Sequence, residues 1–179
     1  IMNMSSLIVQ TDDGLVSNAN GYIDNAYAIN YWAARGVTLP DDEKLSQAII
    51  LASDYADQRF TYKGERLNGR NQRTQWPRKN IQDVEGYDVN GIPNELKEVI
   101  SEYAKRILVD GITLAPDKDP NTPPILSKSE GVSTITESVT YGNGGRPLLP
   151  SYPAADNKLK VAGFLAGSFG GLVGSLVRG

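Results

Sequence analysis

Basic side chains are concentrated in one stretch of the sequence, residues 59–79. Seven cations and a single acid, Glu65, give this stretch a formal charge of +6 in a chain whose net charge is −3, so the remainder carries −9. Guanidinium and ammonium groups bind phosphates and carboxylates through charge-assisted hydrogen bonds. The stretch therefore predicts a contact surface for DNA or for an acidic protein. The predicted contact residues are Arg59, Lys63, Arg66, Arg70, Arg73, Arg78 and Lys79.

Aromatic residues interrupt the same stretch and leave three interpretations open. In the first, the cations contact nucleic-acid phosphates while Phe60, Tyr62 or Trp76 stacks on bases. In the second, the arginines pair with carboxylates of another protein. In the third, Trp76 and Pro77 anchor the loop against the body of the protein, Arg78 pairs internally, and the other charges are solvated. We favour the third interpretation for Trp76 and an interface, with protein rather than DNA, for the group of cations.

Histidine and cysteine are both absent from the chain. Their absence excludes Ser-His-Asp triads, histidine zinc sites, thiolate metal sites and cysteine nucleophiles. The net charge of −3 argues against a protein that coats nucleic acid with its whole surface, although it allows a local basic patch. We therefore expect a binding or structural protein rather than an enzyme, with no catalytic residue, no metal and no cofactor.

Two segments before the basic loop have the features of helices that position it. The first helix is predicted to begin at Asp24, whose side chain caps the first turn, and to end at Gly36. The second is predicted to begin at Asp41 or Asp42 and to end near Arg59. Its apolar stripe is rich in alanine, which indicates close approach to another helix.

A third helix is predicted after the basic loop, with Pro93 in its first turn and Gly111 as its stop signal. Its predicted buried face is Leu96, Val99, Ile100, Tyr103 and Ile107, and its predicted solvent face is Glu95, Lys97, Glu98, Glu102 and Lys105. Amphipathic stripes of this kind are typical of helices that pack into a bundle.

The expected fold class is mainly α: a small bundle of three main helices and a short C-terminal helix, with extended arms and a minor β-strand or hairpin. Prolines after Gly111 exclude a helix or central strand there, whereas β-branched residues at 132–139 predict one strand or a small hairpin. The expected parts are an N-terminal extended arm (1–21), a helical bundle (22–111) with a long basic loop (60–92), a Pro-rich linker and β-strand or hairpin (112–150), and a short helix with a Gly-rich C-terminal arm (151–179).

Residues 161–177 carry no charge and include Gly-xxx-Gly spacings that also occur in membrane helix pairs. The segment is at the lower limit of length for a membrane span, and its many Gly and Ser residues weaken helix formation. We expect a flexible apolar arm that contacts a partner or a neighbouring subunit. Its predicted contact residues are Phe164, Leu165, Phe169, Leu172 and Leu176.

Seven blocks of sequence follow one another in a recognisable order. They are SLIVQTDDGLVSNANGYI, AYAINYWAARG, AIILASDYADQRFTYKGERL, QWPRKNIQDVEGYDVNGIP, ELKEVISEYAKRIL, EGVSTITESVTYG and YPAADNKL. This order resembles the small head-tail connector (adaptor) proteins of tailed bacteriophages, which are often labelled DnaT-like single-stranded-DNA-binding proteins. The most specific part is DYADQRF, two residues, then KGERL, followed closely by QWPR. The Gly-rich run after Leu165 departs from the family pattern, so its role does not follow from the resemblance.

The resemblance implies a structural virion protein that forms a ring, commonly dodecameric, beneath the portal and joins it to the neck or tail. The implied partners are the portal protein, the neck or tail completion proteins, further copies of the chain, and the genomic double-stranded DNA in the channel. The implied location is the portal vertex of the virion, and the host cytoplasm before assembly. No membrane association is expected.

The DnaT-like label implies an alternative function, that of a single-stranded-DNA-binding replication accessory protein. This function predicts salt-sensitive binding of single strands by the basic loop and its aromatic side chains. The sequence shows no repeated aromatic platform and no series of strands typical of an OB-fold, so we prefer the connector interpretation. A membrane-associated phage protein is a third interpretation, which rests on the C-terminal segment alone.

Overall fold

The computed structural model describes residues 6–117, 125–130, 137–141 and 150–167. The chain divides into two compact units, Ile1–Ile112 with Tyr152–Gly179, and Thr113–Ser151. Within the described residues, the first unit holds the helices and a very small sheet, and the second holds another two-stranded sheet.

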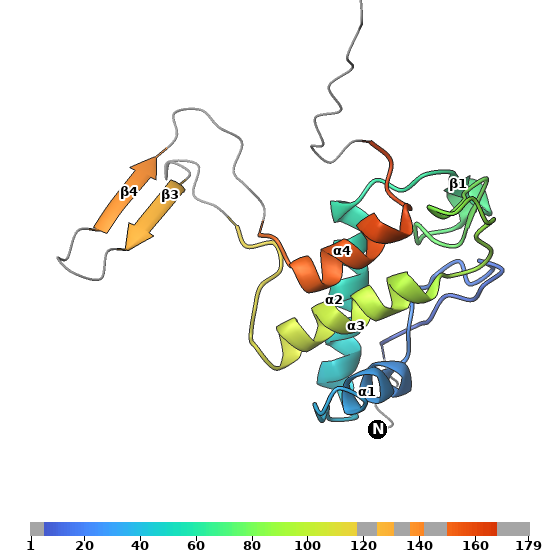
Figure 1. The fold of residues 1–179 in the computed structure, drawn as a ribbon. Helices are drawn as coiled ribbons and strands as arrows, with labels where there is room; N and C mark the ends of the chain where they lie inside the picture. Colours follow the sequence, from blue (N-terminus) through green and yellow to red (C-terminus); the bar gives the residue numbers. More distant parts are fainter. Residues whose placement is uncertain (1–5, 118–124, 131–136, 142–149, 168–179) are drawn as a thin grey trace, which may run out of the picture. The chain divides into compact units, whose positions relative to one another are not determined.

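The described part of the first unit contains four α-helices: α1 (Asn25–Ala33), α2 (Glu43–Arg59), α3 (Asn94–Leu108) and α4 (Pro153–Ala162). Helix α3 packs against each of the other three, and α1 also contacts α2 (Figure 1). This arrangement agrees with the prediction of a mainly helical protein with three main helices and a short C-terminal one.

Acidic side chains set the starts of the first two helices. Asp24 accepts a hydrogen bond from the backbone amide of Tyr27 at 2.8 Å, and Asp42 accepts one from that of Leu45 at 3.0 Å. These carboxylates satisfy amides that have no partner within the helix and interact favourably with its dipole. Asp42, rather than Asp41, is therefore the cap of α2.

An apolar core fills the space between the helices. Its fully buried aliphatic side chains include Leu45, Ile49, Leu96, Val99, Ile100 and Leu159. Ala52 and Ala56 of α2 and Ala104 of α3 are also fully buried, and their small side chains let the helices approach closely. Burying one large aliphatic side chain contributes about 1.5–3 kcal/mol. This packing, more than intrinsic helix propensity, stabilises the short helices.

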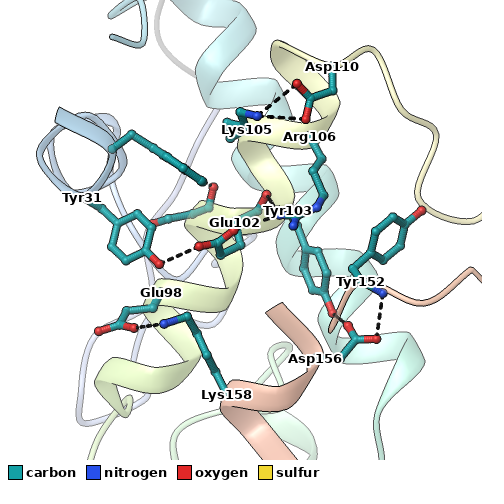
Figure 2. A network of polar contacts seen from close by, with 12 residues as sticks. Tyr31, Glu98, Glu102, Tyr103, Lys105, Arg106, Asp110, Tyr152, Asp156 and Lys158 are labelled. Atoms are coloured by element: carbon teal, nitrogen blue, oxygen red, sulfur yellow. Dashed lines mark hydrogen bonds and ion pairs between the residues drawn. The ribbon is translucent and has the colours of Figure 1, made fainter. Parts of the chain in front are cut away.

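A buried carboxylate joins α2, α3 and α4, and Figure 2 shows its contacts with Tyr103 and Tyr152. Asp156, in the first turn of α4, accepts hydrogen bonds from Arg59 of α2 at 2.9 Å, from the Tyr103 hydroxyl of α3, and from the Tyr152 backbone amide at 3.2 Å. Burial, together with the hydrogen bond to Asp156, raises the pKa of Tyr103 well above its ordinary value. The phenol therefore stays protonated and remains a hydrogen-bond donor.

Glu102, which the helical periodicity places on the solvent side, is buried instead. Its carboxylate accepts a hydrogen bond from Tyr31 of α1 at 2.7 Å and pairs with Arg106 at 2.9 Å (Figure 2). Helix α1 packs on α3 and removes this position from water, which the periodicity of α3 alone does not reveal. Ile107, predicted to be buried, is only half-buried.

Residues 6–21 fold onto the first unit rather than forming the predicted extended arm. The backbone amide of Gln10 donates to the carbonyl oxygen of Gly21 at 2.9 Å. The Gln10 side chain is buried and donates to Thr74 in the basic loop at 2.9 Å. A polar side chain buried in this way satisfies its hydrogen bonds only if the segment docks. Residues 1–5 lie outside the described residues.

The second unit contains two antiparallel strands, β3 (Ile125–Glu130) and β4 (Glu137–Tyr141), in a register that pairs Ile125 with Tyr141. Of the segment predicted as one strand or a small hairpin (132–139), residues 137–139 lie in β4, and residues 132–136 lie outside the described residues. The strand that pairs with β4 precedes the predicted segment. The first strand lies in a segment partly assigned to the Pro-rich linker. Proline has no amide to donate, but the run of prolines ends at Pro124, so the following amides are free to pair.

Candidate nucleic-acid interface

The basic loop is built on a small antiparallel sheet. Strand β1 (Glu65–Arg66) pairs with β2 (Arg78–Lys79), and the short helix η1 (Gly69–Asn71) lies between them in sequence. Gly64, just before β1, has φ +68°, and a Cβ atom there would lie 2.3 Å from the carbonyl oxygen of Lys79. Only glycine fits this close approach of two backbones.

Arg78 belongs to the interior of the loop and not to its outer surface. It is 9% exposed. Its guanidinium donates to the carbonyl oxygens of Lys63 and Gly64, both at 2.7 Å, and to that of Gln75 at 3.0 Å. Burial lowers the pKa of Arg78 from its ordinary value. The guanidinium joins the two sides of the loop, as the interpretation of internal pairing anticipated, although its partners are carbonyl groups rather than a carboxylate.

Two further predicted contact residues are also engaged within the chain. Arg59 pairs with Asp156 at 2.9 Å and donates to the Tyr55 hydroxyl at 2.7 Å. Arg66 donates to the carbonyl oxygen of Gln72 at 2.8 Å. Arg59 and Asp156 are 97 residues apart in the sequence, so no local pattern indicates this ion pair.

The other four predicted contact residues are exposed: Lys63, Arg70, Arg73 and Lys79. Lys79 lies 3.9 Å from Glu65 in a solvent-exposed pair, which contributes little to stability. The side chains of Lys63, Arg70 and Arg73 make no hydrogen bond or ion pair with any described residue. These four, called the loop cations below, are the positive charges that the loop presents to a ligand. Their role as contact residues remains a prediction.

The aromatic side chains of the loop are buried and are not available to stack on bases. Trp76 is 0% exposed, and Phe60 and Tyr62 are each 5% exposed. The Trp76 ring meets Tyr62 and Phe164 edge-on, with centroids 5.6 Å and 5.4 Å away. Pro77 is buried beside it. These contacts are those expected of residues that anchor the loop.

Asp57 and Tyr22 hold the backbone of the loop, a role that no local pattern of residues indicates. The Tyr22 hydroxyl donates to Asp57 at 2.6 Å and accepts from the backbone amide of Trp76 at 3.1 Å. Asp57 also accepts from the backbone amide of Gln75 at 3.1 Å. Gln72 is fully buried and donates to the carbonyl oxygen of Pro77 at 2.9 Å. The backbone of the loop is therefore held by buried side chains, and its exposed cations project from an ordered segment.

The raised pKa of Asp57 leads us to expect that folding stability decreases as the pH rises. Desolvation raises its pKa from 3.8 to about 6, so the folded protein holds this proton more tightly than the unfolded chain does. Its stabilising contribution is complete below about pH 4 and is lost as the pH rises through about 6. We expect Asp57→Asn to remove this part of the pH dependence, measured by urea denaturation across that range. A stability difference between wild type and variant that does not change with pH would contradict the prediction.

The C-terminal residues predicted to contact a partner fall into two groups. Phe164 and Leu165 are buried in their own chain, 2% and 9% exposed. Phe164 packs on Trp76, and Leu165 forms a β-bridge with Tyr62. These two residues help to hold the basic loop and do not belong to a free arm. The other three, Phe169, Leu172 and Leu176, lie outside the described residues.

The described ranges contain neither a metal-binding cluster nor a membrane-spanning helix. No group of three or more acidic side chains there is arranged to hold a metal ion. The helices described are all too short or too polar to cross a membrane.

A family model described as "Putative DnaT-like ssDNA binding protein" matches residues 5–179, a range that includes the whole basic loop and all four described helices. No curated protein and no solved structure matches the chain.

Proposed function

The chain belongs to the DnaT-like single-stranded-DNA-binding family, and on that premise we propose that it is a non-enzymatic protein that binds DNA through the phosphate backbone. The observation that carries this proposal is the set of four loop cations, exposed on a loop whose backbone is held from within. A loop whose backbone is already ordered loses less conformational freedom when its cations meet phosphates.

Because the aromatic side chains of the loop are buried, we propose that the loop contacts phosphates rather than bases. Proteins that bind single strands without sequence preference usually combine a cationic groove with aromatic rings on which bases stack. In this loop Phe60, Tyr62 and Trp76 are all buried, so the cations remain as the contact groups. Phosphate contacts position a strand but carry no sequence information. We therefore propose binding that is insensitive to base sequence.

The salt dependence of binding measures the number of phosphates neutralised. Four cations predict a slope of log K against log salt of about −3 for single strands, so affinity falls about fiftyfold for a fourfold rise in salt. Arg70→Ala with Arg73→Ala is expected to reduce the slope by about 1.4. Fluorescence anisotropy with a labelled oligothymidine over a salt series measures both values.

Lys44→Ala is the matched control, because Lys44 is an exposed cation outside the loop. It should leave the slope unchanged. A slope close to zero for the wild type, or an equal change in the control, would refute phosphate binding by the loop cations.

A second candidate function is a head-tail connector, in which a ring of copies beneath a phage portal surrounds the DNA channel in the virion. It is favoured by the same burial of aromatic rings, because a loop that contacts only phosphates has no need of unpaired bases. It is supported further by the resemblance of the ordered sequence blocks to phage connectors. In this setting the loop cations would meet duplex DNA or acidic groups of the portal or a neck protein.

The two candidates differ in strand preference and in assembly. Anisotropy with single-stranded and duplex probes of equal phosphate number tests the first difference, and negative-stain microscopy of the chain mixed with a portal tests the second. Strong preference for single strands without ring formation favours the accessory protein. Equal or weaker binding of single strands, with rings on the portal, favours the connector.

A further inference from the structure

A groove of about 660 Å³ lies in the first unit between α4 and the segment that connects β2 to α3. Val84 and Val161 line it and are 72% and 73% exposed. The Val84 amide donates to the carbonyl oxygen of Ala162 at 3.0 Å, which keeps the connecting segment against the end of α4. Two exposed valines therefore line one groove whose two sides are joined by this backbone hydrogen bond.

Acidic side chains surround these valines. Asp83, Glu85, Glu95 and Glu98 line the groove, against one basic residue, Lys158. Lys158 is already paired with Glu98 at 2.6 Å (Figure 2). Glu85 and Glu95 are exposed and make no side-chain hydrogen bond or ion pair with any described residue. The groove therefore fits an apolar side chain flanked by cations.

The tip of the basic loop has this pattern. Leu67 is 36% exposed, and Arg70 and Arg73 follow it at three-residue steps, both exposed. The tip does not fill the groove of its own chain, because the groove valines and Leu67 all remain exposed. Charge is also segregated over the sequence as a whole, with +6 in residues 59–79 and −9 elsewhere.

We propose that the acidic groove binds the loop tip of a second copy of this chain. Leu67 would cover the two valines, while Arg70 and Arg73 pair with Glu85 and Glu95. The contact joins two different surfaces, so each bound copy keeps one free loop or one free groove and further copies can add.

The proposed contact uses Arg70 and Arg73, two of the four cations proposed to bind DNA. Only the expected competition with DNA rests on the proposed function. Arg70 and Arg73 cannot pair with Glu85 and Glu95 and with phosphates at the same time. Self-association and DNA binding through this loop therefore compete, and higher salt weakens both.

Sedimentation velocity without DNA tests the contact, over a concentration series at low salt. Glu85→Lys with Glu95→Lys, and separately Arg70→Glu with Arg73→Glu, are each expected to weaken self-association by about tenfold or more, because both ion pairs become repulsive. An equimolar mixture of the two double variants should restore it, because each variant then meets a complementary charge. Circular dichroism checks that both variants are folded.

A wild type that stays monomeric throughout the series would overturn the proposal, and so would a mixture that associates no better than either variant alone. The groove would then need another occupant, such as a basic segment of a different protein. The groove variant also separates this proposal from the first, because it retains all four loop cations and should bind oligothymidine at least as tightly as the wild type. Loss of DNA binding in the wild type would refute the proposed function and leave the sedimentation result unaffected.

Discussion

Replacing Asp156 with alanine is expected to lower the free energy of unfolding by about 3–5 kcal/mol. Asp156 is 1% exposed and accepts hydrogen bonds from Arg59, Tyr103 and the backbone amide of Tyr152. Its removal leaves a guanidinium that is only 14% exposed without its carboxylate, and leaves the other two donors unsatisfied. Urea denaturation followed by far-UV circular dichroism measures the loss.

Two control variants separate charge, hydrogen bonding and surface pairing. Asp156→Asn keeps an acceptor for Tyr103 and removes the charge, so we expect a smaller loss. Lys158→Ala breaks the partly exposed pair with Glu98 and is expected to cost about 1 kcal/mol or less. If Asp156→Ala costs no more than Lys158→Ala, the buried carboxylate does not hold α2, α3 and α4 together.

Replacing Trp76 with alanine is expected to cost about 3–5 kcal/mol, since it removes a large, fully buried ring between Tyr62 and Phe164. Trp76→Phe should cost much less. Phenylalanine keeps an apolar ring, and it removes an indole N–H that has no hydrogen-bond partner among the described residues. The same urea titrations measure both values.

The phenylalanine variant also tests what Trp76 does for binding. If the ring only anchors the loop, Trp76→Phe should leave the affinity for oligothymidine and its salt slope unchanged. Stacking on a base contributes about 1–3 kcal/mol per base. That value is for removal of the whole ring, and phenylalanine can still stack. Any reproducible loss of affinity in Trp76→Phe, in a variant that remains folded, would therefore show that Trp76 leaves its buried position to meet DNA.

The cations of the basic loop therefore divide into two kinds with different roles. Arg59, Arg66 and Arg78 hold the protein together, through a carboxylate in one case and backbone carbonyls in the others. The four loop cations remain for a ligand. This division makes substitutions of the first group unsuitable for testing binding, because they would weaken the fold.

Local sequence was sufficient to predict the helices. Periodic apolar residues and the caps at Asp24 and Asp42 act over a few residues, so they can be recognised without knowledge of the rest of the fold. Counting charges located the basic loop for the same reason. The tryptophan at its end indicated an anchor, because tryptophan is highly buried on average, and the proline beside it restricts the path of the backbone.

The helical class, the absence of histidine and cysteine chemistry, and the position of the basic loop all follow from the amino-acid sequence. The packed fold was needed to see which cations are exposed, that Glu102 is buried, and that Phe164 packs on Trp76 instead of belonging to an arm. These features depend on contacts between residues that lie far apart along the chain. Arg59 and Asp156, and Tyr22 and Trp76, become partners only when the helices and loops that carry them pack together, and no local pattern records which distant group will satisfy a given charge or donor.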